Sequence, residues 1–426
     1  MKIVSFLGFN KYDQTTYLHP NYPENEQKLS TPFFQEALVE FYQPTTLYTL
    51  LTNKVETQIP RGADKTNWQA LQERLANKVD LQPIRNIPER NTPDDIWCIF
   101  DKITNCLQEK DCVIFDITHS FRSIPVVALL AASYLRVVRQ VNIKGLLYGA
   151  FEAKNEWNET PSFDLLPIVS LLEWTTATDQ FLKTGNGETL AHLLSHSNAL
   201  HEHPKNLAEN IHKISQGLRI LRPLDVMQQA AQLPISIQNA APTIYQDVPP
   251  FALLLKRVEA DYSKFGLESS GLENPQEFKE RAKISLINLL KIVEWYIDKE
   301  QIVQALSLAR EWLPTLLCYY FEVDAFAEKN REEMELLLRG GKYKDPVTKE
   351  TIKESKYLPQ WNQISETKRK ALPKIWTGQP SLTSLRNDVL HSSFRKNPRS
   401  AEDIINQTKL IYKELEKIAE QWLGSD

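Results

Sequence analysis

The hydrophobic pattern of the first 170 residues alternates between strand-like and helix-like segments. Short apolar runs predict strands, and the uninterrupted run 112–117 is typical of a central parallel strand buried on both faces. Apolar residues three and four positions apart predict helices between these runs. The alternation predicts a Rossmann-like α/β domain with a doubly wound parallel sheet over residues 1–170. The predicted strands are 3–9, 45–51, 112–117 and 143–150, and the predicted helices are 32–41, 64–78, 94–107 and 123–138.

Beyond about residue 161 the pattern is helical almost throughout. Apolar residues recur at helical spacing around Leu289 and Leu313. Turn-rich segments interrupt the pattern at 245–250 and at 268–275. We therefore expect a helical connecting segment at 171–274 and an all-α domain at 275–426. A Gly- and Lys-rich segment at 339–346 predicts a hairpin or loop inside the last domain.

Composition places the chain among cytoplasmic proteins. It has 426 residues, of which 42% are apolar, so it can bury the cores of two or three domains. It contains no run of about 20 apolar residues, and its first residues turn polar too quickly for a signal peptide. The four cysteines have no Cys-x-x-Cys spacing, so neither a zinc site nor a disulfide framework is indicated.

The charge is distributed unevenly along the chain. The net charge is −4, but residues 339–399, the basic stretch, contain 14 Lys plus Arg against 5 Asp plus Glu, a net of +9. A concentration of positive charge of this kind favours a nucleic-acid surface. A Lys-rich solvated loop explains the same count, so charge alone does not decide between them.

Two loops follow predicted strands at the edge where parallel sheets bind ligands. Gly8, Phe9 and Asn10 follow the first strand, and Asp116-Ile-Thr118-His-Ser120-Phe-Arg122 ends the 112–117 strand. Helix N-termini at this edge offer unpaired N–H groups and partial positive charge, so the loops predict a phosphate-binding pocket. Neither loop contains Gly-x-Gly-x-x-Gly, which disfavours an ordinary NAD enzyme. The alternative is that Asp116 stabilises its own loop with Arg122 as a surface partner.

A second motif, Arg386-Asn387-Asp-Val-Leu-His391, lies in the basic stretch behind the helix-start signal Ser381 to Ser384. Arginine binds phosphate oxygens through forked hydrogen bonds, and imidazole exchanges protons near neutral pH. Together they suit RNA cleavage by the neighbouring 2′-hydroxyl without a metal. Residues five apart on a straight helix point about 140° apart, so a bend or a second subunit is needed. The alternative is a surface Arg paired with an acid.

Two other features carry weaker hypotheses. His192 and His196 are four apart on a predicted helix near His201 and His203, and such a pair can bind a metal, although a polar helix face is the preferred interpretation. Glu311 lies on a strongly apolar helix. We expect it to orient Arg386 through a salt bridge, with an exposed charge as the alternative.

The residues just described resemble CRISPR-associated ribonucleases of type III systems, which join a CARF domain to a HEPN domain. The resemblance rests on the opening residues 1–8, the loop 116–122, Tyr148-Gly149-Ala150 and the motif 386–391, which match in order and spacing. It implies a CARF domain at 1–170 and a HEPN domain at 275–426. CARF loops often carry Gly where Ser120 stands.

The resemblance also implies a mechanism. The family forms homodimers in which two CARF domains bind one cyclic oligoadenylate, with cyclic tetra-adenylate as first choice, and two HEPN domains form one cleft that cuts single-stranded RNA. It implies catalytic roles for Arg386, Asn387 and His391, and no cofactor or metal. The ligand-binding residues it implies are Gly8, Phe9, Asn10, Thr118, Ser120 and Arg122.

Three other functions remain open at the level of sequence. The chain is compatible with a non-enzymatic nucleotide sensor that regulates a partner or binds DNA. It is also compatible with a CARF protein that degrades its own cyclic oligoadenylate through Thr118 and Arg122. A DNA-cutting effector is disfavoured, because no pattern of paired acids and Lys around a metal is evident.

Overall fold

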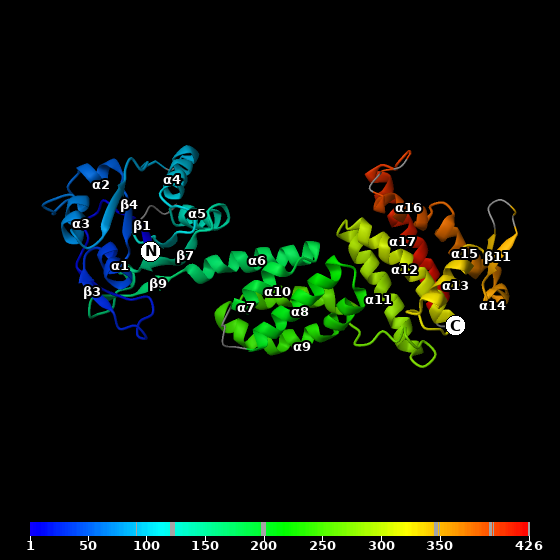
Figure 1. Ribbon diagram of the computed structural model, residues 1–426. Helices are drawn as coiled ribbons and strands as arrows, with labels where there is room; N and C mark the ends of the chain where they lie inside the picture. Colours follow the sequence, from blue (N-terminus) through cyan, green and yellow to red (C-terminus); the bar gives the residue numbers. More distant parts are fainter. Residues whose placement is uncertain are drawn as a thin grey trace. The chain divides into compact units, whose positions relative to one another are not determined.

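The computed structural model describes residues 1–90, 92–119, 124–196, 202–344, 348, 350–391, 394 and 396–424. The chain forms two compact units, Met1–Glu173 and Trp174–Asp426 (Figure 1). Within the described ranges, no helix is long and apolar enough to cross a membrane.

A six-stranded sheet forms the centre of the N-terminal unit, with strand order β5-β4-β1-β6-β7-β9. All neighbouring strands are parallel except β9, which pairs with β7 in the antiparallel direction. Parallel strands joined by helices make this a doubly wound α/β domain, as expected. The strands are β1 (Lys2–Phe6), β4 (Thr46–Leu50), β5 (Asp80–Ile84), β6 (Cys112–Asp116), β7 (Asn142–Gly149) and β9 (Ser162–Asp164).

Helices cover both faces of this sheet. The helices α1 (Phe34–Tyr42) and α3 (Asn67–Leu75) pack on one face, and α4 (Pro93–Asn105) and α5 (Ile124–Val138) pack on the other. Side chains alternate along a strand, so Ile3 of β1 enters one core and its neighbour Val4 enters the other. Burial on both faces explains why the strand sequences read as continuous apolar runs.

Several short elements were not expected from the sequence. The short helix α2 (Asn53–Thr57) follows β4, and a 3₁₀ helix occupies Phe151–Ala153. A second sheet of three strands joins β2 (Thr15–Leu18), β3 (Lys28–Thr31) and β8 (Glu159–Thr160). The edge strand β5 also escaped prediction, because its residues include Pro83 and none of them is fully buried.

The second unit is helical, and α6 (Leu166–Thr184) runs into it from the first. Its first helices pack on one another through buried tyrosines. The Tyr262 hydroxyl donates to the Phe181 carbonyl at 2.5 Å, and the Tyr296 hydroxyl donates to the Leu218 carbonyl at 2.6 Å. These helices are α7 (Glu188–His196), α8 (Glu202–Arg219), α9 (Pro223–Asp247) and α10 (Phe251–Tyr262), followed by a 3₁₀ helix at Ser263–Phe265.

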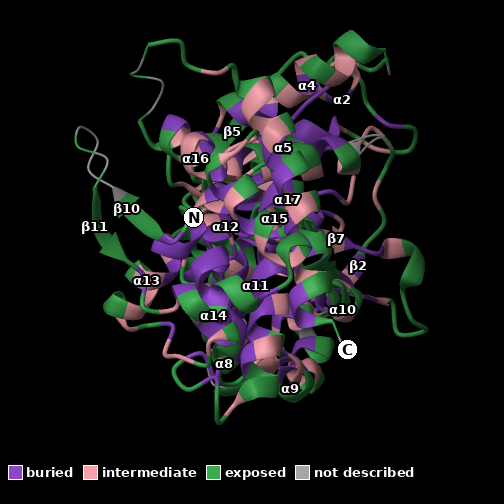
Figure 2. Cartoon of the chain, turned by 90° about the vertical axis from the view of Figure 1, so that its right-hand side faces the viewer, coloured by how far each residue is buried: buried purple, intermediate pink, exposed green. Residues whose placement is uncertain are grey.

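The C-terminal helices surround α12, in which Trp312 is fully buried and donates its indole N–H to the Leu286 carbonyl at 2.8 Å. Figure 2 shows the buried faces of α11 and α12 in purple. The segment after α13 forms an exposed hairpin of β10 (Lys342–Lys344) and β11 (Thr351–Glu354). The boundary expected at residue 274 stays a prediction. The helices are α11 (Lys279–Asp298), α12 (Ile302–Tyr320), α13 (Glu328–Leu338), α14 (Leu358–Gln363), α15 (Glu366–Thr377), α16 (Leu382–Leu390) and α17 (Ala401–Leu423).

Candidate functional site

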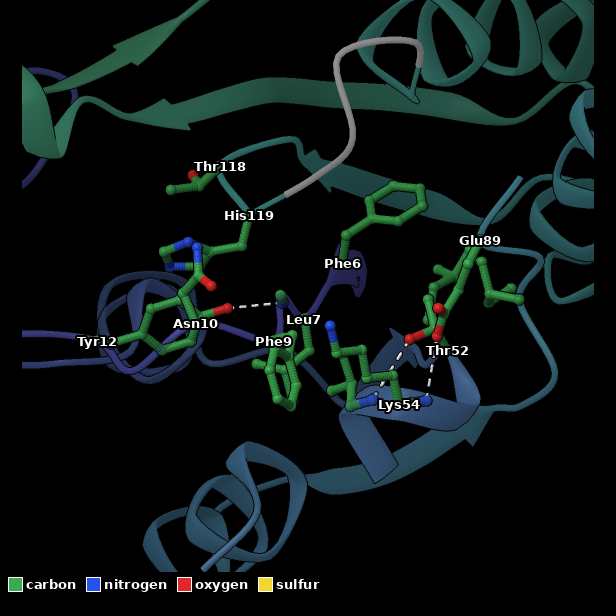
Figure 3. A pocket seen from close by; sticks show the side chains of 14 residues that line it. Phe6, Leu7, Phe9, Asn10, Tyr12, Thr52, Lys54, Glu89, Thr118 and His119 are labelled. Carbon is green, nitrogen blue, oxygen red and sulfur yellow. Dashed lines mark hydrogen bonds between the residues drawn. The ribbon is translucent and has the colours of Figure 1, made fainter. Parts of the chain in front are cut away.

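A pocket of about 430 Å³ opens at the carboxyl ends of β1, β4 and β6 (Figure 3). This edge is where open α/β sheets bind their ligands. Four of the residues expected from the sequence line it, namely Gly8, Phe9, Asn10 and Thr118. Ser120 and Arg122 lie outside the described residues. The other lining residues are Phe6, Leu7, Tyr12, Leu50, Thr52, Lys54, Val55, Ile87, Glu89 and His119.

The loop after β1 is held in one conformation by side chains. The side-chain amide of Asn67 donates to the carbonyl oxygens of Gly8 and Asn10, at 2.8 and 2.9 Å. The backbone N–H of Gly8 donates to the Tyr12 hydroxyl at 2.6 Å. A Cβ atom on residue 8 would lie 2.8 Å from that hydroxyl oxygen, so a larger residue there would push the end of the Tyr12 side chain away.

The loop after β6 depends on a buried carboxylate. Asp116 is fully buried and accepts hydrogen bonds from the Ser5 hydroxyl at 2.6 Å and from the Thr118 N–H at 2.9 Å. Burial raises the pKa of Asp116 to about 6, although these hydrogen bonds oppose the rise. The Thr118 hydroxyl in turn accepts from the Gly149 N–H at 2.9 Å. Asp116 is therefore a loop stabiliser, which agrees with one half of the alternative drawn from the sequence.

Sequence reasoning missed an aromatic pair at the pocket wall. The Tyr12 ring stacks on His119, with ring centres 4.1 Å apart and planes 25° apart. Burial lowers the pKa of His119 to about 4, so its imidazole is neutral at pH 7. Its Nε2 atom is buried and has no hydrogen-bond partner among the described residues. The sequence signal was slight, because Tyr12 is simply a loop residue two positions after Asn10.

The opposite wall carries a cation. The Lys54 ammonium lies 4.1 Å from the centre of the Phe9 ring, and the Lys54 backbone N–H donates to the Glu89 carboxylate at 3.2 Å. Thr52 begins α2 as its N-cap and accepts from the Val55 N–H at 3.3 Å. Lys54 was not selected from the sequence, because no motif marks the short turn after β4.

The second candidate site lies on α16 in the other unit. Ser381 caps this helix by accepting a hydrogen bond from the Ser384 N–H at 3.1 Å, as the helix-start signal predicted. Arg386 lies within the helix and His391 is its C-cap residue, where the N–H still bonds to the Asn387 carbonyl at 2.9 Å. The helix therefore ends at the histidine, and the straight-helix geometry does not continue past it.

Arg386 makes few bonds within its own chain. Its Nη1 donates to the Asn387 side-chain oxygen at 3.2 Å, and its buried Nε has no partner among the described residues. Glu311 does not orient it. The Glu311 carboxylate pairs with Arg310 at 2.6 Å and with Arg331 at 2.5 Å, so that prediction was wrong. The surface of α16 exposes Asn387, and His391 is also exposed.

Described residues after His391 are tied to α16 by hydrogen bonds and an ion pair. The Phe394 N–H donates to the His391 carbonyl at 2.9 Å, and the Phe394 side chain is 93% exposed. Arg399 bonds to the buried Asp388 carboxylate. An aromatic ring thus lies in solvent next to the proposed catalytic histidine.

The histidine-rich segment has a simple local structure. The rings of His192 and His196 stack at 4.1 Å on α7, and His196 Nδ1 lies 2.9 Å from the His192 carbonyl oxygen. His201 lies outside the described residues. In the part of the chain that the structure describes, no three His, Cys, Asp or Glu residues are grouped so as to hold a metal ion.

Comparison with known proteins identifies the class of this protein. Residues 2–152 match the family model of the CARF domain of the CRISPR system endoribonuclease Csx1, and residues 170–272 match that of the second domain of CRISPR-associated protein MJ1674. The MJ1674 protein of Methanocaldococcus jannaschii is 33% identical over 126 residues, which cover 29% of this chain and 19% of that relative. The chain therefore spans only a small part of the relative's length.

Among solved structures, Enterococcus italicus Csm6 bound to cyclic hexa-2′-fluoro-hexa-dAMP aligns with 99% of this chain and 94% of that one, at 9% identity and a TM-score of 0.47. Residues 2–152 of this chain are therefore similar to a CRISPR-associated CARF domain, and residues 170–272 to the second domain of a CRISPR-associated protein. The family resemblance drawn from the sequence is confirmed.

Proposed function

We propose that this protein is a ribonuclease switched on by a cyclic oligoadenylate. The observation that carries the proposal is the CARF match over residues 2–152, with its strand-end pocket, in a chain that also places Arg386 within α16 and His391 at the C-terminal end of that helix. The family model that matches residues 2–152 is named after an endoribonuclease. A sensing domain and a cutting domain in one chain are the parts that such a switch requires.

Cyclic tetra-adenylate is the activator that we propose for the pocket. The loop amide of Gly8 and the hydroxyl of Thr118 lie at the strand ends, where phosphates bind. The aromatic face of Phe9 and the cation of Lys54 suit an adenine ring and a phosphate, respectively. We also include Ser120 and Arg122 among the proposed ligand-binding residues, because they follow Thr118 closely in the sequence.

The proposed reaction is cleavage of single-stranded RNA by its own 2′-hydroxyl. The 2′-oxygen bonds to phosphorus while the bond from phosphorus to the 5′-oxygen breaks, leaving a 2′,3′-cyclic phosphate. His391 moves the proton of the hydroxyl or of the leaving oxygen, and Arg386 stabilises the phosphate charge. Asn387 is exposed, as is His391 four residues later, and its side-chain oxygen accepts a hydrogen bond from Arg386. The reaction requires no metal ion.

An exposed apolar face supports the proposed homodimer. Four apolar residues recur along one side of α5 at helical spacing, and each is about half exposed or more. A twofold dimer through such a face removes these side chains from water. The residues are Val126 (58%), Leu130 (56%), Tyr134 (46%) and Val137 (81%).

The positive charge of the basic stretch supports an RNA-binding surface less strongly than its count of Lys and Arg residues indicates. Cations of the basic stretch pair with nearby carboxylates, as in Lys342 with Glu354 at 2.9 Å and Lys370 with Glu366 at 2.5 Å. Phe394 adds a different kind of contact, since bases of single strands stack on exposed aromatic rings.

Substitution of the two motif residues tests the proposal. We expect His391→Ala and Arg386→Ala to lose cleavage of a labelled single-stranded RNA by at least a hundredfold while cyclic tetra-adenylate still binds. The matched control is His212→Ala, which removes a half-buried histidine of α8 and leaves the rate unchanged. Full activity in His391→Ala would remove that residue from the mechanism. Ligand binding without any cleavage by the wild type would instead indicate a non-enzymatic sensor.

A further inference from the structure

We propose that the Tyr12 hydroxyl occupies the position that a ligand phosphate takes on the Gly8 amide, so that the ligand must displace Tyr12 to bind. The inference rests on the proposed function, because it takes a phosphodiester ligand for this pocket. Tyr12 then sets the ligand concentration at which the protein responds, and it selects against ligands without a phosphate.

The contact between Tyr12 and Gly8 blocks the amide completely. A backbone N–H donates along one direction, and here a hydroxyl oxygen lies 2.6 Å from the nitrogen in that direction. The loop has little freedom to turn the amide elsewhere, because Asn67 holds the carbonyls of Gly8 and Asn10. The amide becomes available only when the Tyr12 side chain moves.

Tyr12 lies at the pocket wall, where its ring packs against two other aromatic side chains. Its ring stacks face to face on His119 (Figure 3) and contacts Phe33 edge to face, with ring centres 5.4 Å apart in the second pair. Burial raises the pKa of Tyr12 well above its usual value, so the hydroxyl is neutral at pH 7. The residue is held by ring contacts and one hydrogen bond, without an ion pair.

The exchange favours anions over neutral ligands. Hydrogen bonds to a charged phosphate oxygen are roughly twice as strong as those to a neutral hydroxyl, so a phosphate can replace Tyr12 on Gly8 whereas a neutral nucleoside gains nothing. When Tyr12 leaves, the face of His119 is uncovered beside an Nε2 atom that has no partner among the described residues. An aromatic base of the ligand can then stack on the uncovered His119 ring and form a hydrogen bond with its Nε2 atom.

Removal of the hydroxyl alone tests this inference. Tyr12→Phe keeps both ring contacts but leaves the Gly8 amide without its internal partner. We expect cyclic tetra-adenylate to bind roughly five- to tenfold more tightly by calorimetry, because the competing hydrogen bond is absent. The concentration for half-maximal RNA cleavage falls by the same factor, while adenosine stays a poor ligand for both proteins.

The matched control is Tyr296→Phe, which removes a hydroxyl bonded to the Leu218 carbonyl in the other unit and leaves the affinity unchanged. A melting curve of each variant shows that it is folded. Equal or weaker binding by folded Tyr12→Phe overturns the inference, because the hydroxyl is then no competitor. Tighter binding without RNA cleavage supports the inference and contradicts the ribonuclease. If the wild-type protein binds no cyclic tetra-adenylate, both the inference about Tyr12 and the proposed function are contradicted.

Discussion

Arg399 and Asp388 form an ion pair in which the guanidinium Nη1 lies 3.0 Å from the carboxylate Oδ2. Asp388 is only 2% exposed, and a second nitrogen of Arg399 donates to the Ser384 hydroxyl at 3.3 Å. Both partners of Arg399 belong to α16, the helix that carries Arg386. The pair therefore links the end of the segment after His391 to the helix that holds the rest of the motif.

Loss of this ion pair lowers both stability and activity. Asp388→Asn leaves Arg399 with a neutral partner, and we expect a fall of about 1–3 kcal/mol in the free energy of unfolding by urea. RNA cleavage falls several-fold, because the segment that follows the proposed catalytic histidine is less firmly held. The control is Glu366→Gln, which breaks the exposed pair with Lys370 and costs little. An Asp388→Asn protein with the wild-type urea midpoint would show that the pair does not stabilise this segment.

A stacking role of Phe394 predicts a defect in substrate binding. Phe394→Ala removes a ring that is 93% exposed, so the fold loses almost nothing. The KM for single-stranded RNA rises by roughly 5- to 150-fold, since stacking of one base on an aromatic ring is worth about 1–3 kcal/mol. Phe394→Trp keeps the wild-type KM, whereas Phe394→Leu resembles the alanine variant. Activity that is insensitive to all three substitutions argues against a stacked base.

The strands that could be predicted from the sequence are those buried on both faces. The apolar runs of β1, β4, β6 and β7 predicted these strands to within one to three residues at each end, because burial on both faces removes polar residues. The edge strand β5 is half exposed and contains Pro83, so its pattern does not differ from that of a loop. A short strand such as β8 depends on a partner far along the chain, since Glu159 pairs with Thr16, and a local pattern does not reveal such a partner.

The candidate site was only partly predictable for a similar reason. Gly8 and Thr118 follow strands directly, and their position in the pocket follows from the strand ends alone. Tyr12 and Lys54 reach the pocket through the packing of loops from different strands, and no spacing rule relates them. The failed pairing of Glu311 with Arg386 has the same origin, because the choice among three arginines depends on how α12 packs against α13.

The buried carboxyl of Asp116 predicts a dependence of stability on pH. Its pKa rises from 3.8 to about 6 on folding, so the folded state binds this proton more tightly than the unfolded state does. The contribution to stability is fully present below about pH 4, is lost as the pH rises to about 6, and then stays constant. The shift corresponds to about 3 kcal/mol. Asp116→Asn cannot titrate, and its amide can still accept from Thr118 and bond to Ser5.

We therefore expect Asp116→Asn to gain stability relative to the wild type between pH 4 and pH 7. Urea unfolding of both proteins at pH 4, 5, 6 and 7 measures this difference, and other carboxyl groups cancel in the comparison. A difference between the two proteins that is the same at every pH would contradict the raised pKa.

If the apolar face of α5 forms the dimer interface, one charged side chain introduced on this face weakens the dimer. Val137→Asp places a carboxylate on a residue that is 81% exposed, so the protomer keeps its fold. If this face is the interface, burial of the charge weakens the dimer by tenfold or more in sedimentation velocity. We expect RNA cleavage to fall with it, since the proposed cleft needs both copies. Ile220→Asp, at a residue that is 63% exposed after α8, is the control and stays dimeric. Dimers of unchanged affinity in Val137→Asp would place the interface elsewhere.

The central claim is that a ligand in the N-terminal unit switches on RNA cleavage at Arg386 and His391. Its most direct test is cleavage of a labelled single-stranded RNA in EDTA, with and without cyclic tetra-adenylate, by the wild type, Arg122→Ala and His391→Ala. The account predicts cleavage only by the wild type with ligand, and a 2′,3′-cyclic phosphate on the product. Cleavage that ignores the ligand, or that persists in His391→Ala, would contradict it.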